Sequence, residues 1–337
     1  MRFNRRKIFS NLFLLLCSTA FALVSAELLL RLAVRLGIEP GWKYQRTLLY
    51  GETRHPRHKI LILGDSFATH WETGFSLYEL LVKDLTPYGV SLLDTAEGGF
   101  GPLDYLTQLR AFGPSYHPDT VLLFYYVGND LTSVQYGGDG WNRFKKYLKP
   151  WLTRSRLFYF AANLREQWFQ NHLKYEEAFH LAKERIINPW LLDLSREKKN
   201  FVLDNVLMKT PENMQAWEKI EGLLGEIHWF CQKIHARLIL VVIPHTAQIN
   251  SSHFSFYKRL AFSVDERTLS TDKPQTLLGE FCRKEQILCL DLLPAFRAKR
   301  EKEFYRDNDD HFNREGFELA EKLVLDFLQQ NVKLSRS

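Results

Sequence analysis

Apolar and polar positions along the chain follow two different periods. Between residues 56 and 332, short apolar runs alternate with longer stretches in which apolar residues recur at helical spacing. The run VLLFYYV, residues 121–127, is apolar throughout, which is typical of a strand buried on both faces of a sheet. Strands that alternate with helices predict a parallel sheet covered by helices on both faces. The sequence therefore predicts an α/β protein.

The predicted elements follow one another in the order that such a sheet requires. The predicted strands are 58–63, 90–94, 120–127, 237–243 and 286–291. The predicted helices are 76–85, 103–112, 213–235, 274–284 and 314–330. No internal repeat or low-complexity tract is visible in the sequence, so a single globular domain over residues 56–332 is expected.

The N-terminus has the pattern of a membrane-targeting element. Residues 8–26 carry no charge, and the basic cluster Arg5-Arg6-Lys7 precedes them. This length matches the hydrocarbon core of a bilayer, and the basic cluster favours a cytoplasmic N-terminus with an extracytoplasmic body. The predicted segments are a cytoplasmic tail 1–7, a single-pass signal anchor 8–30 and a linker 31–55.

Two alternatives to an uncleaved anchor stay open. Val24-Ser25-Ala26 has the small-residue spacing of a signal-peptide cleavage site. A buried amphipathic helix is the other alternative. The apolar run Leu28-Leu29-Leu30, which continues beyond Glu27, favours the anchor.

Residues 135–212 form an interruption between the third and fourth predicted strands. It is too long for a plain connection, and its own helical patterns predict a mostly helical insertion at the mouth of the site. Residues 143–174 interleave aromatic side chains with eight basic residues and one acidic residue. A cover helix packed on the domain and a helix on a membrane or acidic-glycan surface both fit this pattern. Export argues against a nucleic-acid platform.

Composition and charge are those of an ordinary globular protein. The chain has 337 residues, of which 45% are hydrophobic and 25% charged, and its formal net charge is +6. The positive charge is concentrated in the N-terminal tail and the insertion, so the rest of the chain is mildly acidic. Cys231, Cys282 and Cys289 match no zinc spacing, and we interpret them as buried small side chains.

Three polar motifs stand where reactive groups gather in a parallel sheet. Ser66 ends the tripeptide Gly64-Asp65-Ser66 directly after the first strand, and Gly128-Asn129-Asp130 follows the third. Asp309-Asp310-His311 precedes the last helix. The carboxyl ends of parallel strands meet at one edge, so we expect these side chains to lie together.

These residues supply every role that acyl transfer through serine requires. Ser66 is the predicted nucleophile, His311 the base, and Asp309 the carboxylate that orients the imidazole. The oxyanion donors are the backbone N–H groups of Ser66 and Gly99 and the side-chain amide of Asn129. Gly99 has no side chain to keep an oxyanion from its N–H.

The order of these motifs resembles the SGNH (GDSL) hydrolase superfamily, in its membrane-anchored bacterial type. The resemblance covers about residues 56–332 apart from the insertion. It implies a flavodoxin-like three-layer α/β/α sandwich, with Ser66, Gly99, Asn129 and His311 in the roles that name the superfamily. The ending Asp309 to Asn313 is similar to the D-x-H-W motif of alginate-type O-acetyltransferases, with Phe312 in place of tryptophan.

The chain departs from that pattern in two places. The position three residues before the histidine, where many members carry aspartate, is Asn308; Asp309 is therefore preferred, with Asp310 as the substitute. In the second motif, Asp94 and Ala96 replace an asparagine and a glycine.

Side chains near the motifs are candidates for the pocket. Phe67, His70 and Trp71 follow the nucleophile closely, and His245 follows the fourth strand as a pocket residue or rival base. His55 and His58 could ligate a metal, but no metal site is predicted, and no cofactor motif is present.

The predicted function is that of a serine esterase tethered to a membrane and acting on an O-acyl group of a glycan, lipid or small molecule. Transfer of the acyl group to an extracytoplasmic polysaccharide is the first alternative. A catalytically silent binding module on the same fold is the second. No nucleic-acid partner is expected.

Overall fold

The computed structural model describes residues 5–35, 56–69, 76–135, 155–158, 161, 191, 194–195, 198–307, 309–332 and 334. These residues divide between two compact units. The first unit comprises Met1–Thr47 and Leu148–Lys174, and the second comprises Leu48–Tyr147 and Tyr175–Ser337. The predicted linker beyond residue 35, the residues 136–154 and most of 159–197 lie outside the described residues.

The second unit is built on a five-stranded parallel sheet, as the sequence predicts. The strands are β1 (His58–Leu63), β2 (Val90–Asp94), β3 (Thr120–Tyr126), β4 (Arg237–Ile243) and β5 (Leu288–Asp291). Their order in the sheet is β2-β1-β3-β4-β5, and every pair is parallel. This is the flavodoxin-like order, in which the winding direction reverses between β1 and β3. The predicted fold class is confirmed.

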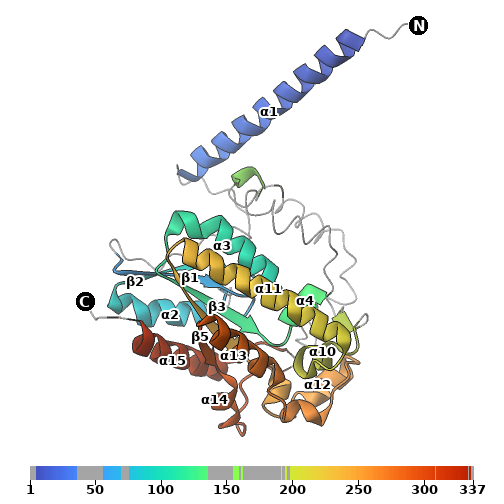
Figure 1. The fold of residues 1–337 in the computed structure, drawn as a ribbon, viewed down its shortest axis with the longest axis vertical. Helices are drawn as coiled ribbons and strands as arrows, with labels where there is room; N and C mark the ends of the chain where they lie inside the picture. The colour runs from blue at the N-terminus through green and yellow to red at the C-terminus, as the bar shows by residue number, and fades with distance from the viewer. Residues whose placement is uncertain are drawn as a thin grey trace. The chain divides into compact units, whose positions relative to one another are not determined.

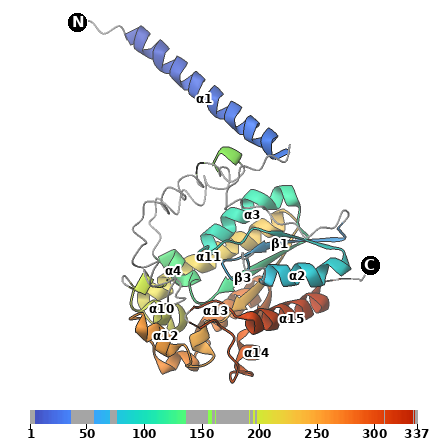
Figure 2. The same ribbon diagram turned by 180° about the vertical axis from the view of Figure 1, so that it is seen from behind.

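Helices cover both faces of the sheet. In Figure 1, α3 and α11 lie side by side over one face, and Figure 2 shows α2 and α15 side by side over the other. Among its described residues, the second unit has the helices α2 (Leu77–Leu85), α3 (Pro102–Tyr116), α4 (Asp130–Gln135), α10 (Phe201–Leu207), α11 (Pro211–Lys233), α12 (Phe254–Arg259), α13 (Lys273–Glu285), α14 (Leu293–Arg297) and α15 (Arg314–Asn331).

The apolar strands bury both of their faces. Leu61 and Leu63 of β1 belong to the core cluster under α3 and α11, whereas Ile60 and Ile62 belong to the cluster under α2 and α15. A continuous apolar run is therefore required, since consecutive side chains point to opposite faces.

The ends of several elements differ from the predicted ones by a few residues. β5 begins at Leu288, two positions later than predicted, because Gln286 adopts a left-handed φ of 56° as the C-cap of α13. β3 ends at Tyr126, one residue early. Cys282 lies on α13 and Cys289 on β5, and both are free thiols, as is the buried Cys231.

The first unit contains the long apolar helix α1 (Arg5–Arg35). Its segment Phe13–Ala33 has a mean hydropathy of 2.1 and is long and apolar enough to cross a membrane. The helix continues to Arg35, so the first five residues of the predicted linker, 31–35, are helical.

Glu27, the acidic residue within this apolar segment, contacts residues 155–157 of the basic aromatic stretch 143–174. Its carboxylate accepts hydrogen bonds from Ser155 Oγ at 2.8 Å and from the N–H groups of Arg156 and Leu157 at 3.0 and 2.8 Å. Arg31, one turn further along α1, donates to the same carboxylate at 2.7 Å. Glu27 therefore caps a helical turn from another part of the first unit.

Candidate active site

Ser66 lies just beyond the carboxyl end of β1, at the point where the sheet reverses its winding direction. Gly64 allows the sharp turn into this position, because a Cβ there would stand 2.7 Å from the Cβ of Ala68. Asp65 is fully buried and accepts a hydrogen bond from the Phe67 N–H at 3.0 Å. This closed Asx turn fixes the backbone that presents the Ser66 hydroxyl.

His311 is held by a loop that folds back on itself before α15. Tyr305 and Phe312 form an isolated antiparallel bridge, and the Arg306 N–H donates to the His311 carbonyl at 2.9 Å. Asn313 is the N-cap of α15 and accepts from the Gly316 N–H at 3.0 Å. The histidine is thus anchored on both sides by backbone hydrogen bonds.

The structure brings Ser66, His311 and Asp309 together in one line of hydrogen bonds. Ser66 Oγ lies 2.7 Å from His311 Nε2, although the two residues are 245 positions apart in the chain. On the other side of the ring, His311 Nδ1 lies 2.8 Å from Asp309 Oδ1. Because a carboxylate only accepts, Nδ1 carries the proton and Nε2 is left to accept the proton of Ser66.

A second carboxylate faces the same imidazole nitrogen. Asp310 Oδ1 lies 3.4 Å from His311 Nδ1, is buried, and has no hydrogen-bond partner among the described residues. Burial raises the pKa of Asp310. Burial would also raise the pKa of Asp309, but the hydrogen bond from His311, the charge of His311 and the hydrogen bonds from Asp310 together lower it to about 2. The preferred and the substitute carboxylate therefore differ in that only Asp309 is within hydrogen-bond distance.

The two carboxylates make His311 an unusually strong base. Burial would lower the pKa of His311, but the charges of Asp310 and Asp309 and the hydrogen bond to Asp309 raise it to about 9. Only the neutral imidazole can take the proton of Ser66. A reaction that uses His311 as its base should therefore speed up as the pH rises towards 9.

Asp310→Asn is expected to lower the pH at which the reaction rate increases. The variant removes a negative charge next to the imidazole, and such a charge shifts a pKa by roughly one to three units. The pH dependence of kcat/KM should thus rise at a pH lower by about one unit or more, with the maximal rate nearly kept. The measurement is a series of kcat/KM values from pH 6 to 10. An unchanged profile would show that Asp310 does not act on the base.

The predicted oxyanion donors Asn129 and Gly99 belong to turns that contact the Gly64-Asp65-Ser66 turn. Asn129 Nδ2 donates to Asp65 Oδ2 at 2.9 Å, which places the amide beside the nucleophile and leaves its second hydrogen without an acceptor among the described residues. Gly99 has a left-handed φ of 76°. The preceding residue, Gly98, lies close to Ser66, since a Cβ on Gly98 would stand 3.8 Å from the Cβ of Ser66. The Gly99 N–H also has no acceptor in the described part of the chain.

Asn129→Ala is expected to lower kcat by about 10²–10³-fold with little change in KM, because an oxyanion donor acts mainly on the transition state. Asn205→Ala is the control, since it truncates another asparagine, one that is buried and bonds Thr132 and Phe201. Steady-state kinetics on both variants provide the measurement. A rise in KM with kcat unchanged would contradict the oxyanion role.

Two further residues, the buried Asp130 and the half-buried Arg306, hold the site in place. Asp130 accepts from the Tyr126 N–H at 3.0 Å and from the Tyr105 hydroxyl at 2.8 Å, which fixes the turn that carries Asn129. Arg306 Nη1 lies 4.0 Å from Asp309 Oδ2, and its Nε donates to the Phe312 carbonyl. Asp130 stands in the sequence motif itself, whereas no sequence signal indicates Arg306.

The predicted pocket residues take other positions. Phe67 is fully buried and packs against Tyr126 and the His311 ring, with ring centroids 4.2 and 5.3 Å away. It supports the imidazole from within the core. His245 is also buried: Nδ1 accepts from the Ala247 N–H, and Nε2 lies 3.2 Å from the Tyr257 hydroxyl. Burial, aided by His253, lowers the pKa of His245 to about 3, so it is a poor rival base.

Four other residues of the sequence prediction, His55, His70, Trp71 and Asn308, lie outside the described residues. Asp309, Asp310 and His311 offer ligand atoms within 4.8 Å of one another and could in principle hold a metal ion. However, His311 already has hydrogen-bond partners at both ring nitrogens. A metal ion there would have to displace Asp309 or Ser66 from one of those nitrogens.

Phe312 is the apolar anchor of the histidine loop. It is fully buried among Phe67, Phe296, Tyr305 and Phe317, with ring centroids 4.9 to 5.5 Å away. Phe312→Ala is expected to lower the free energy of unfolding by about 3–5 kcal/mol, as buried phenylalanine truncations do. Denaturant unfolding measures this loss. The control is Trp229→Ala, which removes a 49% exposed aromatic residue; an equal loss in both variants would contradict the anchoring role.

Comparison with known proteins gives likenesses of fold only. No family model matches the chain, and no curated protein matches it. Among solved structures, the chain is similar to TesA, at 11% identity and a TM-score of 0.42 over 81% of this chain and 98% of that one. It is also similar to the psychrotrophic esterase EstA from Pseudoalteromonas sp., at 12% identity and a TM-score of 0.41 over 82% and 98%. It is similar as well to the acetyl xylan esterase AlAXEase, at 15% identity and a TM-score of 0.43 over 81% of this chain and 99% of that one.

Proposed function

We propose that this protein is a serine esterase that hydrolyses an O-acyl ester through an acyl-enzyme on Ser66. The observation that carries the proposal is the hydrogen-bonded line from Ser66 Oγ through His311 to Asp309, with distances of 2.7 and 2.8 Å. A serine, a base and an orienting carboxylate in this geometry are what nucleophilic acyl transfer requires. Ester-bearing glycans, lipids and small molecules are all substrates of this chemistry.

The proposed reaction proceeds in two steps. Ser66 Oγ attacks the ester carbonyl carbon while His311 Nε2 takes its proton, and Asp309 stabilises the imidazolium that forms. The negative oxygen accepts hydrogen bonds from the N–H groups of Ser66 and Gly99 and from Asn129 Nδ2. His311 then gives its proton to the leaving alcohol. In the second step water attacks the acyl carbon while His311 takes its proton. The bond between Ser66 Oγ and the acyl carbon then breaks, His311 returns the proton to Ser66 Oγ, and the acid is released.

The location proposed for this reaction is the extracytoplasmic side of a membrane. The apolar segment Phe13–Ala33 and the basic residues before it support a single-pass anchor with the tail 1–7 in the cytoplasm and the domain 56–332 outside. The insertion 135–212 belongs to this domain in the proposal.

Hydrolysis of p-nitrophenyl esters tests the activity and narrows the substrate. The full-length chain in neutral detergent is assayed with acetyl, butyryl and octanoyl esters, each beside Ser66→Ala. Ser66-dependent turnover is expected, and the preferred acyl length then follows from the ratio of kcat/KM values. Rates equal to those of Ser66→Ala for all three esters, together with no labelling of Ser66 by a fluorophosphonate, would favour a silent binding module.

Acyl transfer to a saccharide is the second candidate. The resemblance of the loop Asp309 to Asn313 to an O-acetyltransferase motif favours it, and water and a sugar hydroxyl attack the same acyl-enzyme. Incubation with p-nitrophenyl acetate and acetyl-free oligosaccharides separates the two reactions by mass spectrometry. Acetylated oligosaccharide would establish transfer, whereas free acetate alone would establish hydrolysis.

A further inference from the structure

A pocket of about 900 Å³ opens at the end of the sheet opposite to Ser66. It lies at the amino ends of the strands: His58 begins β1, Thr120 begins β3 and Arg237 begins β4. The six residues of β1 alone separate His58 from the candidate active site by roughly 20 Å. A volume of this size is within the usual range for small-molecule sites.

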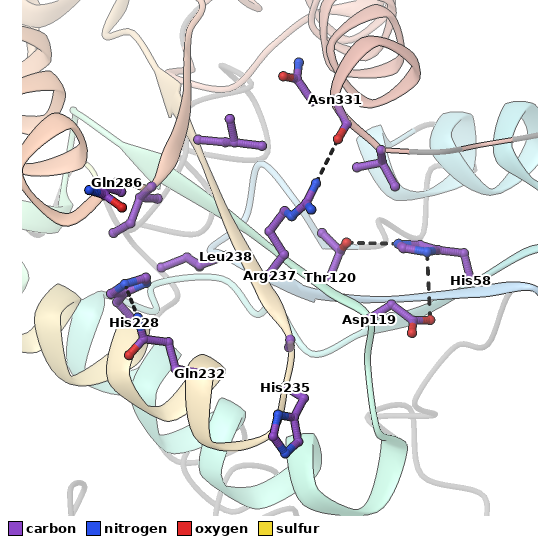
Figure 3. A pocket seen from close by; sticks show the side chains of 14 residues that line it. His58, Asp119, Thr120, His228, Gln232, His235, Arg237, Leu238, Gln286 and Asn331 are labelled. Carbon is purple, nitrogen blue, oxygen red and sulfur yellow. Dashed lines mark hydrogen bonds and ion pairs between the residues drawn. The ribbon is translucent and has the colours of Figure 1, made fainter.

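Figure 3 shows how the polar side chains are distributed around this pocket. His58, Thr120 and Asp119 stand at one side, His228 and Gln232 at the other, and Arg237 extends between them. The Arg237 side chain donates to the carbonyl of Asn331, at the end of α15, at 2.8 Å. A guanidinium has five N–H donors, so most of its capacity is left for another acceptor.

Arg237 is the positively charged side chain of the pocket and the group that an anion would bind. Asp119 is the acidic residue among those that line it, and its carboxylate already accepts from the Lys59 N–H at 2.7 Å. It also lies 3.9 Å from His58 Nδ1. Within the described part of the chain, no carboxylate forms an ion pair with Arg237. The arginine charge is therefore not neutralised by the residues around it.

The rest of the lining suits an apolar group. Ala236, Leu238, Ile287, Leu288 and Val332 also line the pocket. An occupant that is purely ionic would leave this surface unused, whereas an apolar body next to an anionic head would contact both kinds of lining.

We propose that this pocket binds a small organic anion, with a carboxylate or phosphate head on Arg237 and an apolar body against Leu238 and Ile287. The guanidinium fork matches either head group in bidentate geometry. The site is distinct from the proposed esterase centre and does not depend on that proposal. It offers a binding function at the opposite end of the same strands.

Benzoate and phenyl phosphate test the two head groups, and benzamide is the neutral control of similar shape. The dissociation constant of each is measured from the rise of the unfolding temperature of the full-length chain with ligand concentration, at constant ionic strength. At least one of the two anions is expected to bind saturably, and benzamide much more weakly. The anion that binds more tightly identifies the head group. Absence of saturable binding by both anions, or equal binding of benzamide, would overturn the proposal.

Variants at Arg237 locate the site. Arg237→Gln is expected to weaken anion binding at least tenfold, while its amide can still donate to the Asn331 carbonyl and so preserve the end of α15. Arg237→Lys keeps the positive charge but loses the bidentate guanidinium, so an intermediate affinity is expected. If Arg237→Gln lowers the unfolding temperature of the free protein, Arg237→Lys is used as the test variant instead.

Two further variants serve as controls for the position of the bound anion. Arg314→Gln removes an exposed arginine paired with Glu318 at 2.8 Å, and Ser66→Ala alters the candidate active site. Both are expected to bind the anion as the wild type does. Wild-type affinity in Arg237→Gln and Arg237→Lys, or loss of binding in Ser66→Ala, would show that the anion binds elsewhere.

Discussion

Ser66→Ala is expected to lower the rate of ester hydrolysis by about 10⁴-fold or more, because it removes the atom that forms the acyl-enzyme. The oxyanion donors and the binding surface would remain, so a small residual rate above that in water is expected. Ser66 Oγ lies 2.7 Å from His311 Nε2, and the serine is buried to 9% exposure. The substitution therefore deletes one hydroxyl with little effect on packing.

The combination with His311→Ala makes this prediction sharper. Serine and histidine act as one unit, so each single variant and the double variant should have nearly the same low rate. Steady-state kinetics with one p-nitrophenyl ester measures all three, and Ser270→Ala, at an exposed serine, is the matched control. Multiplying losses in the double variant would mean that the two residues do not act on the same step.

Asp309→Asn is expected to lower kcat by about 10³-fold or more, because an amide can donate to His311 Nδ1 and select the wrong tautomer. With the proton on Nε2, the imidazole cannot take the proton of Ser66. The carboxylate of Asp310, 3.4 Å from the same nitrogen, is the group that can hold Nδ1–H in its place. Asp309→Ala, which leaves that nitrogen open to Asp310, should accordingly retain more activity than Asp309→Asn.

The double variant with both aspartates changed to asparagine separates these contributions. It should approach the rate of His311→Ala, since no carboxylate would then face Nδ1. The measurement is kcat at a pH above 9, where the wild-type His311 is neutral and differences in its pKa no longer affect the rate. Full activity of Asp309→Asn under these conditions would assign the orienting role to Asp310.

The core of the fold could be predicted from local patterns, because the apolar residues within a strand indicate whether that strand is buried. The apolar run of β3 indicates a central strand without reference to any other part of the chain. Element ends are less accurate where a cap decides them, as at Gln286, whose left-handed conformation delays β5. Such a conformation costs a residue other than glycine about 1–2 kcal/mol, and nothing in the apolar pattern indicates it.

The candidate site could be predicted only in part, because some of its features follow from local motifs and others from contacts made in the folded chain. Gly64-Asp65-Ser66 and Gly128-Asn129-Asp130 stand directly after strands, so their meeting at one edge follows from a parallel sheet. The support of the His311 ring by Phe67 joins residues far apart in the chain. The hydrogen bonds of Arg306 within the His311 loop are local, but they depend on the folded shape of that loop. The pocket around Arg237 likewise gathers residues from four strands and two helices.

By itself, the sequence determined the α/β class, the apolar N-terminal helix and the set of residues with acyl-transfer chemistry, since these depend on local hydrophobic periods and on residue type. Only the tertiary structure decided that Asp309 rather than Asp310 is within hydrogen-bond distance of His311. It also placed Phe67 and His245 in the core and left Arg237 without a carboxylate partner among the residues that the structure describes. These outcomes depend on how the folded chain positions its side chains, where differences of a few tenths of an ångström in distance decide which groups interact. Such differences cannot be detected in a local sequence pattern.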